Sequence, residues 1–485
     1  MPKKNINRRQ FLGEASCAAV GSMAFLNSVI NLGAINTLAA RPHILSNNED
    51  YKAMVCILLA GGCDTHNVLV PTETSKYNAY VATRGSLALS KTATPAQLLP
   101  LQYNQGGKTY SVHAGMTKVR DMFDANELSF IANIGTLIEP IANKTQYDSG
   151  LKKIPLGLYS HSDQIMQWQT SVPQSRSAVG VAGRIADLLQ DMNTIPEISM
   201  NISLSGKNNF QAGNLFNEYS LSNTTTGSNI GFTPFPTWWS DFGYKNAKRN
   251  TAIKSMAEAQ YSNVFHKTIG TLTGQSMASI EKFRIGLENV VPLNTPFSTT
   301  TLSQDLKKIA ELISVRSFMG AKRQIYFITY GGWDHHDNVI GSQATMLPIL
   351  SNAMAEFNDA LKEIQMHDNV VTFTISDFAR TLTSNGNGSD HAWGGNQIVM
   401  GGPIQGKKII GTYPSLALSN NPYNLSDRGR ILPTTSVDEL YAELALWYGV
   451  SPNDLGYILP NLCNFYSPTC PSLVPNNYSP LGMFS

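Results

Sequence analysis

The sequence predicts an α/β protein, a three-layer α/β/α sandwich around a mostly parallel central sheet. Three observations support this fold class. Short apolar runs without polar interruption are typical of strands buried on both faces of a parallel sheet. Segments with apolar residues at three- and four-residue spacing lie between these runs, and they predict helices that cover the sheet. Acidic residues follow several of the runs directly, at the point where such strands end.

The predicted strands are short and rich in Val, Ile, Leu and Phe. They occupy residues 51–62, 128–135, 324–332 and 369–376, and residues 197–206 are expected to form a fifth. Paired glycines close the first run, which predicts a tight turn at its end.

Two predicted helices have clear signals. Residues 346–364 carry a one-sided apolar stripe and join the strand at 324–332 to the strand at 369–376, which predicts a βαβ unit. A second helix follows Ser436, and Glu439 three residues later predicts a capping box.

The chain of 485 residues is long enough to bury a large core. It has no internal repeats and no long linker, so a single domain over residues 41–485 is the simplest organisation. Residues 207–260 are rich in Asn, Gly, Thr, Pro and Trp and lack periodicity, which predicts an insertion or cap over the sheet. The net charge of +2 argues against a nucleic-acid partner, because binding phosphates requires clustered Lys and Arg.

Residues 1–40 resemble a twin-arginine signal peptide. Arg8 and Arg9 precede a mildly apolar stretch that carries no charge from Ala15 to Ala40. The alternative is a transmembrane anchor, although three asparagines and many small residues disfavour a span. We therefore expect the twin-arginine export machinery to be a partner, cleavage near residue 40, no stable membrane span afterwards, and a periplasmic or secreted protein.

Five cysteines are present, and Cys17 would leave with the signal. Cys463 and Cys470 bracket a short loop and could form a disulfide in an oxidising compartment. Cys56 lies inside an apolar run and is expected to be buried. Cys63 stands beside an acid, where either packing or a functional role is open.

The residues that follow the strands are the candidates for chemistry. In a parallel sheet the carboxyl ends of the strands meet along one edge, where ligands bind. Carboxylates and imidazoles gathered there suit a divalent cation such as zinc or manganese, and one or two ions are possible. The candidates are Asp64 after the first strand, Asp334, His335, His336 and Asp337 after the strand at 324–332, Asp377 after the strand at 369–376, and Asp390 and His391 shortly beyond.

Several motifs resemble those of a known family. They are "GG.D..N.LVP", "GGWD.H", "DH..GG" and "LPTTS.DELYA..L.WYG". The pattern is similar to the exported bacterial family catalogued as domain of unknown function 1501 (DUF1501), which is grouped by fold with the alkaline phosphatase and sulfatase superfamily. The resemblance implies an alkaline phosphatase-like fold, a metal site at the strand ends, and hydrolysis of phosphate, phosphonate or sulfate esters.

The resemblance also assigns roles to individual residues. It implies that Asp64, Asp334, His336, Asp377 and His391 are metal ligands, and Asp390 stands beside them. His335 occupies a position where the family does not require histidine. Phe378 stands where the superfamily has a histidine, which leaves the second metal open.

The superfamily places its nucleophile at a helix N-terminus after the second strand, where backbone N–H groups favour an anion. Ser160 matches that position, with Ser162 second and Thr65 third. Alternatively, Ser160 or Ser162 is only the N-cap of the helix. His161 could bind metal or substrate, or simply pack.

Arg380 could bind a substrate oxyanion, or be the salt-bridge partner of a nearby acid. The formylglycine motif of conventional sulfatases is absent, since "SVPQSR" misses it by one position.

Together these features predict an exported metal-dependent hydrolase-like protein whose substrate is a small-molecule or polymer ester. The rival interpretation is a secreted binding protein without catalysis that recognises polysaccharide or another surface ligand near Trp238 and Trp239.

Overall fold

The computed structural model describes residues 51–195, 198–226, 248–249, 251–253, 255–256, 259, 262–466 and 481–484. The predicted signal peptide, Trp238, Trp239 and Cys470 lie outside these residues. In the part of the chain that is described, no helix combines the length and the hydropathy that a bilayer span requires.

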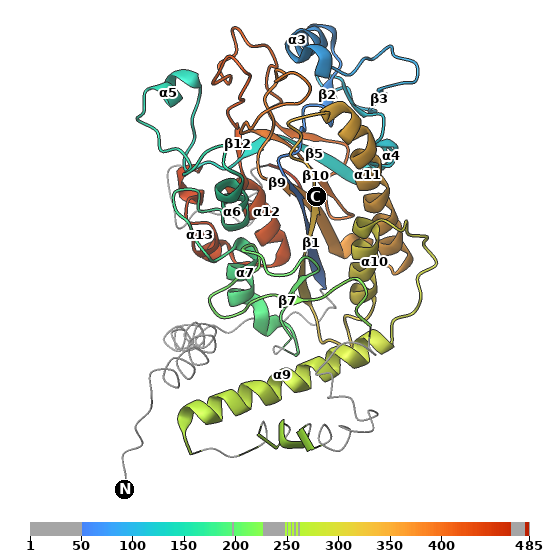
Figure 1. Ribbon diagram of the computed structural model, residues 1–485, viewed down its shortest axis with the longest axis vertical. Helices are drawn as coiled ribbons and strands as arrows, with labels where there is room; N and C mark the ends of the chain where they lie inside the picture. The colour runs from blue at the N-terminus through green and yellow to red at the C-terminus, as the bar shows by residue number, and fades with distance from the viewer. Residues whose placement is uncertain are drawn as a thin grey trace, which may run out of the picture.

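A mixed, mostly parallel sheet forms the centre of the protein (Figure 1). Its strand order is β11-β5-β10-β9-β1-β8-β6-β7, and β12 also pairs with β5. Only β10 runs antiparallel to its neighbours among these strands. The strands are β1 (Lys52–Ala60), β5 (Leu128–Gly135), β6 (Asn201–Ser203), β7 (Tyr219–Ser220), β8 (Arg323–Gly331), β9 (Val370–Ser376), β10 (Gly395–Met400), β11 (Ile409–Gly411) and β12 (Thr435–Ser436).

Four predicted strands are confirmed as β1, β5, β8 and β9, and the fifth shrinks to the three residues of β6. The central strand is β1, which pairs in parallel with β8 from Lys52 to Ala60 and with β9 from Ala53 to Leu59. Since these three strands run in one direction and in register, their carboxyl ends form one edge. The loops that follow them are therefore brought together.

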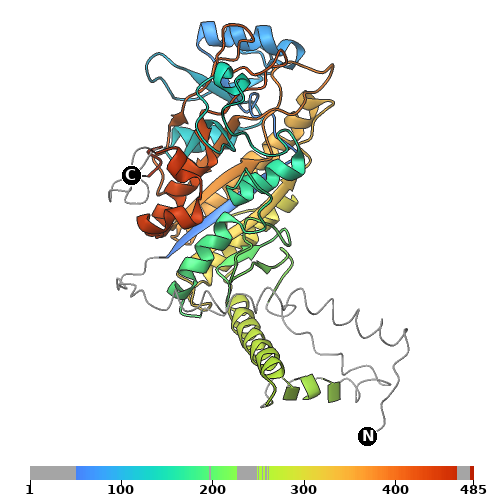
Figure 2. The same ribbon diagram turned by 90° about the vertical axis from the view of Figure 1, so that its left-hand side faces the viewer.

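Helices cover both faces of the sheet, as Figures 1 and 2 show. Successive side chains of β1 point to opposite faces. Val55 and Ile57 belong to a core formed with helices α4 (Thr117–Asp124), α10 (Thr301–Ser314) and α11 (Val339–Glu363). Cys56 and Leu58 belong to a second core with α7 (Val181–Leu189), α12 (Val437–Tyr448) and α13 (Leu455–Ile458). The predicted three-layer α/β/α sandwich is thus confirmed.

Both predicted helices are present. Helix α11 begins at Val339, seven residues before the predicted start, and contains Pro348. It connects β8 to β9, but β1 lies between these two strands, so the βαβ crossover spans one strand. The capping box of α12 is confirmed, because the Ser436 N–H donates to Glu439 Oε2 at 2.7 Å and the Ser436 side chain accepts from the backbone of the first turn.

The smaller elements had no clear sequence signal. A three-stranded sheet of β2 (Leu69–Pro71), β3 (Leu98–Pro100) and β4 (Tyr110–His113) lies with α3 (Thr74–Arg84) toward the upper end in Figure 1, and the long helix α9 (Val264–Glu288) lies at the lower end. The other helices are α5 (Lys144–Asp148), α6 (His161–Thr170) and the 3₁₀ turns Gly85–Leu87, Gln190–Met192, His367–Asn369, Pro452–Asp454 and Leu462–Asn464.

Part of the predicted insertion belongs to the sheet, because β7 pairs with β6. The remainder of residues 207–260 stays a prediction. Cys56 and Cys63 are buried free thiols. Cys463 is disulfide-bonded, whereas Cys470, its predicted partner, lies outside the described residues.

Asp438 in the first turn of α12 links stability to pH. Its carboxyl is fully buried, and this burial raises its pKa from 3.8 to about 7, despite a hydrogen bond from Ser436 Oγ at 3.0 Å. The folded state therefore holds a proton that the unfolded state releases between these pH values, so stability falls as the pH rises through this window. At about 1.4 kcal/mol per pKa unit, the full effect is on the order of 4 kcal/mol.

We expect Asp438→Asn, which mimics the protonated acid, to flatten this dependence. Urea unfolding at pH 5 and pH 8 measures it, with Asp359→Asn on the exposed side of α11 as the control. If the free energy of unfolding of Asp438→Asn falls between pH 5 and pH 8 as steeply as that of wild type, the assignment is contradicted.

Candidate metal centre at the strand ends

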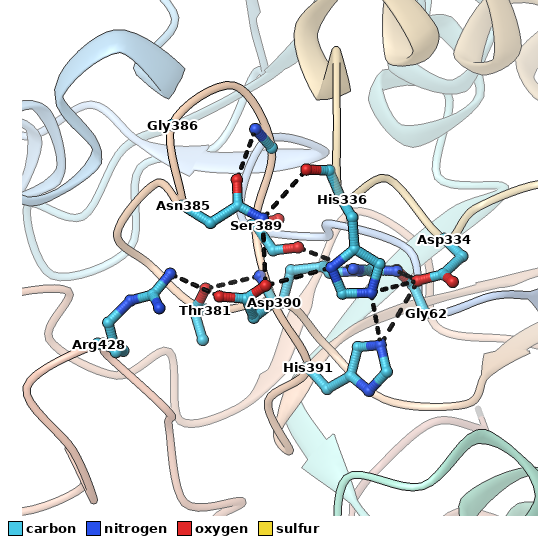
Figure 3. A network of polar contacts seen from close by, with 12 residues as sticks. Gly62, Asp334, His336, Thr381, Asn385, Gly386, Ser389, Asp390, His391 and Arg428 are labelled. Carbon is cyan, nitrogen blue, oxygen red and sulfur yellow. Dashed lines mark hydrogen bonds and ion pairs between the residues drawn. The ribbon is translucent and has the colours of Figure 1, made fainter.

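Three histidines lie around the carboxylate of Asp334 at the carboxyl edge of the sheet. Figure 3 shows two of them, His336 and His391. Asp334 and His336 follow β8, His391 precedes β10, and His161 is the first residue of α6. Asp334 Oδ1 lies 3.1 Å from His336 Nε2 and 3.5 Å from His391 Nε2, and Asp334 Oδ2 lies 3.5 Å from His161 Nε2. His336 Nε2 and His391 Nε2 are 2.9 Å apart.

The other ring nitrogen of each histidine faces a hydrogen-bond acceptor. His391 Nδ1 lies 2.8 Å from the carbonyl oxygen of Tyr159, which can only accept, so Nδ1 carries the proton. His161 Nδ1 faces Asp377 Oδ2 at 2.7 Å, and His336 Nδ1 faces Asp390 Oδ1 at 3.2 Å. All three Nε2 atoms face Asp334, and with a proton on Nδ1 of each ring they would present lone pairs to a cation there.

A neutral Nε2 lone pair that faces a carboxylate is repelled by it, and a bound cation would add to the compensation that Arg380 already gives Asp334. His161 Nε2 is buried and has no hydrogen-bond partner among the described residues. The ligand atoms of His161, Asp334 and His391 all lie within 4.8 Å of one another. Histidines whose Nδ1 proton is held by a carboxylate or carbonyl are the usual form of metal-binding histidine.

The spacing fits a small transition metal. In a tetrahedral zinc site with bonds of about 2.0 to 2.1 Å, neighbouring ligand atoms are about 3.3 Å apart. Four of the separations between possible ligand atoms are 2.9, 3.1, 3.5 and 3.5 Å, while the atoms of His161, Asp334 and His391 lie within 4.8 Å of one another. Three imidazoles and one carboxylate also suit zinc or manganese better than magnesium or calcium, which prefer oxygen ligands.

Backbone conformation places these groups. Tyr159 adopts a left-handed φ of 74°, unusual for a residue with a side chain, and its carbonyl oxygen is the acceptor for His391. Gly61 lets the loop after β1 touch the loop after β8, because a Cβ there would come within 2.5 Å of the Asp334 nitrogen. The Gly61 N–H also donates to Asp377 Oδ1 at 3.0 Å.

Arg380 holds Asp334 and is itself fully buried. Its Nη2 pairs with Asp334 Oδ1, and its remaining hydrogen bonds go to the carbonyl oxygens of Gly61, Gly62, Ser389 and Trp333 at 2.7, 2.8, 2.9 and 3.4 Å. Partial burial opposes ionisation of Asp334, but the hydrogen bond and charge of Arg380 outweigh it and lower the pKa of that carboxyl. These contacts favour the salt-bridge interpretation of Arg380 over an oxyanion-binding one.

Asp377 and Asp390 are expected as metal ligands. In the structure they contact the Nδ1 atoms of His161 and His336, whose Nε2 atoms face Asp334. Asp377 is buried between Gly61 and His161. Asp390 pairs with Arg428 at 2.7 Å through Oδ2 and faces His336 through Oδ1. Their role in this arrangement is to fix the rings that they contact.

Asp64 does not join the cluster. It is fully buried and forms an ion pair with Arg84 of α3, which is equally buried. Its backbone carbonyl accepts a hydrogen bond from Gln343 Nε2 at 2.8 Å. The structure thus brings together Asp334, His336 and His391 but gives Asp64 an internal partner, because Arg84 neutralises its charge within the fold.

The hydroxyl oxygen of each predicted nucleophile contacts another group of the fold. Ser160 is the N-cap of α6, where its Oγ accepts from the Asp163 N–H at 3.5 Å. Ser162 is exposed, with its Oγ 3.2 Å from that of Ser160. Thr65 is buried, and its Oγ1 accepts from the Asn396 N–H at 2.9 Å.

The remaining two candidates stay outside the cluster. His335 is buried beside Trp333, and this burial lowers the pKa of its ring. Asp337 is exposed and accepts from the Asn387 side chain.

The sequence leaves the role of His161 open and gives no indication of Tyr159. The run from Ser160 to Asp163 at the start of α6 predicts a nucleophile. His161 reaches the cluster because it is the first residue of α6 and this helix begins beside the end of β9. This placement follows from the tertiary structure and not from the local sequence. Tyr159 acts through its carbonyl oxygen, and no residue type encodes that contact.

The sequence comparison agrees with the motifs described above. Residues 295–451 match the DUF1501 family model. This family is described as "Protein of unknown function (DUF1501)", and the matched segment contains β8, α11, β9 and α12 with Asp334, His336 and His391. The predicted DUF1501 resemblance is thereby confirmed. No curated protein matches the sequence significantly.

Among solved structures, the chain is similar to the lipoteichoic acid synthase LtaP from Listeria monocytogenes, with a TM-score of 0.33, 9% identity, and coverage of 86% of this chain and 78% of that chain. The PsFucS1 sulfatase from Pseudoalteromonas sp. has a TM-score of 0.32 and 9% identity over 87% of this chain and 71% of that chain. An alkaline phosphatase PafA mutant has a TM-score of 0.23 and 12% identity over 69% and 64% of the two chains.

We expect the purified protein to contain about one zinc or manganese ion per chain, because the three Nε2 lone pairs and Asp334 form one donor set. Elemental analysis after dialysis measures it. His391→Ala should lose the ion, and Asp390→Ala should bind it about 10- to 100-fold more weakly, since the His336 ring loses its anchor.

Asp337→Ala is the matched control, because this acid lies in the same loop as His336 but outside the donor set. Equal metal content in the wild type and in folded His391→Ala would refute the site.

Proposed function

We propose that the chain is an exported, metal-dependent hydrolase-like protein that acts on phosphate, phosphonate or sulfate esters. The observation that carries the proposal is the set of three histidine Nε2 atoms directed at Asp334 on the ligand-binding edge of the sheet. The side chains of Asp334 and His336 are 46% and 44% exposed, so a substrate in solution can reach them.

The residues of the chain prepare the site in a defined way. Arg380 keeps Asp334 ionised, while Asp377, Asp390 and the Tyr159 carbonyl keep each histidine in the tautomer that binds a cation. A bound divalent cation would supply Lewis-acid polarisation of the ester oxygens and a lowered pKa for a coordinated hydroxyl.

Ser160 remains our proposed nucleophile. It directly precedes His161, and its capping hydrogen bond of 3.5 Å is at the long limit, which leaves the oxygen available. The backbone N–H groups of the first turn of α6 also favour an anionic group there. Ser162, whose hydroxyl is adjacent, is the second candidate.

We also propose export by the twin-arginine machinery, on the basis of residues 1–40. The disulfide bond of Cys463 supports this proposal, because disulfides persist mainly in oxidising compartments. The protein would then act in the periplasm or outside the cell.

Nitrophenyl phosphate mono- and diesters, a phosphonate ester and a sulfate ester test the activity. We expect metal-loaded wild type to hydrolyse at least one of them, and His391→Ala to lose at least about 100-fold in kcat/KM, since the metal contribution is removed. Asp337→Ala should retain activity. A metal-loaded wild type that turns over none of these esters would contradict the proposal and favour the binding interpretation.

Two substitutions separate the roles of Ser160. Ser160→Asn keeps an N-cap acceptor, whereas Ser160→Ala removes it and should cost about 1 kcal/mol of stability. If Ser160 is the nucleophile, both variants lose ester hydrolysis in steady-state assays while Ser160→Asn keeps the thermal midpoint of wild type. Full activity of Ser160→Asn would assign the residue to capping alone.

A further inference from the structure

We propose that Arg430 binds the non-bridging oxygens of the anionic group that enters this site. The inference deepens the proposed function and rests on it, because it names the residue that recognises a tetrahedral oxyanion beside the histidine cluster. Arg430 lies in the loop between β11 and β12 and was not identified from the sequence.

Arg430 is attached to the two residues that position His391. Its Nε donates to the His391 carbonyl oxygen at 3.0 Å. Its guanidinium carbon lies 4.2 Å from the centroid of the Tyr159 ring, a stacking contact. Since the Tyr159 carbonyl holds His391 Nδ1, the same two residues fix the histidine ring and the arginine.

The terminal nitrogens of Arg430 are uncommitted. Within the described residues they have neither a hydrogen-bond acceptor nor a carboxylate within 4.0 Å, and the side chain is only partly buried. The other arginines nearby are engaged: Arg380 with Asp334, Arg428 with Asp390, and Arg84 with Asp64. Arg430 is therefore the arginine around this site whose donors remain available to a ligand.

Guanidinium chemistry matches the expected ligand. Two parallel N–H groups fit two oxygens of phosphate or sulfate, and a stacked guanidinium is already oriented for this contact. Arginine also stays charged at every accessible pH. A lysine would keep the charge but not the paired donors, so the two side chains are not equivalent at such a position.

Calorimetric titration of the metal-loaded protein with inorganic phosphate and with sulfate tests this assignment. We expect Arg430→Gln to weaken the affinity for the better of the two anions by about tenfold or more, because a charged bidentate contact is lost. Arg430→Lys should recover only part of this affinity. Metal content should equal that of wild type in both variants.

Arg284→Gln removes the same charge from α9, the helix at the lower end of Figure 1, and should bind the anion as wild type does. The inference fails if Arg430→Gln binds the anion as tightly as wild type, if wild type binds neither anion, or if both Arg430 variants lose the metal together with the anion. Anion binding that depends on Arg430 without turnover of any ester would refute the hydrolase proposal and leave this inference standing.

Discussion

The site depends on three hydrogen bonds that hold the Nδ1 protons of His161, His336 and His391. The acceptor of each bond comes from a different part of the fold: Asp377 directly after β9, Asp390 in the loop before β10, and Tyr159 before the N-cap of α6. Together these bonds orient three imidazole Nε2 atoms toward one carboxylate, an arrangement that a bound cation beside Arg380 would stabilise. The parallel pairing of β8, β1 and β9 makes it possible, because it delivers the loops to a common edge.

Among the residues that the structure describes, one group of His and Asp side chains is arranged to hold a cation. Asp64, which the family resemblance suggested as a ligand, is neutralised by the buried Arg84. Asp377 and Asp390 are used to orient histidines, and Phe378 packs against the rings of His161 and His391. These contacts favour a single ion over two. They also explain why Arg380, fully engaged with Asp334 and backbone carbonyls, leaves oxyanion binding to Arg430 in our account.

The sequence predicted the fold class and the four long strands because a buried parallel strand needs a continuous apolar run, and β1, β5, β8 and β9 have one. It did not predict β10 or the small sheet, whose strands are short and defined by tertiary pairing. Asp334, His336 and His391 could be predicted from their positions after or near strands. The roles of Asp64, Arg380 and Tyr159 could not, since their partners lie 20, 46 and 232 residues away along the chain and no local pattern indicates these pairings.

Anomalous diffraction at the zinc or manganese edge, on crystals of the metal-loaded protein, tests the central claim most directly. The account predicts one strong peak at about 2.0 to 2.2 Å from the Nε2 atoms of His161, His336 and His391 and from an Asp334 oxygen. A peak coordinated by Asp64, with Arg84 displaced, would contradict it, as would metal-loaded crystals without a peak at the histidine cluster.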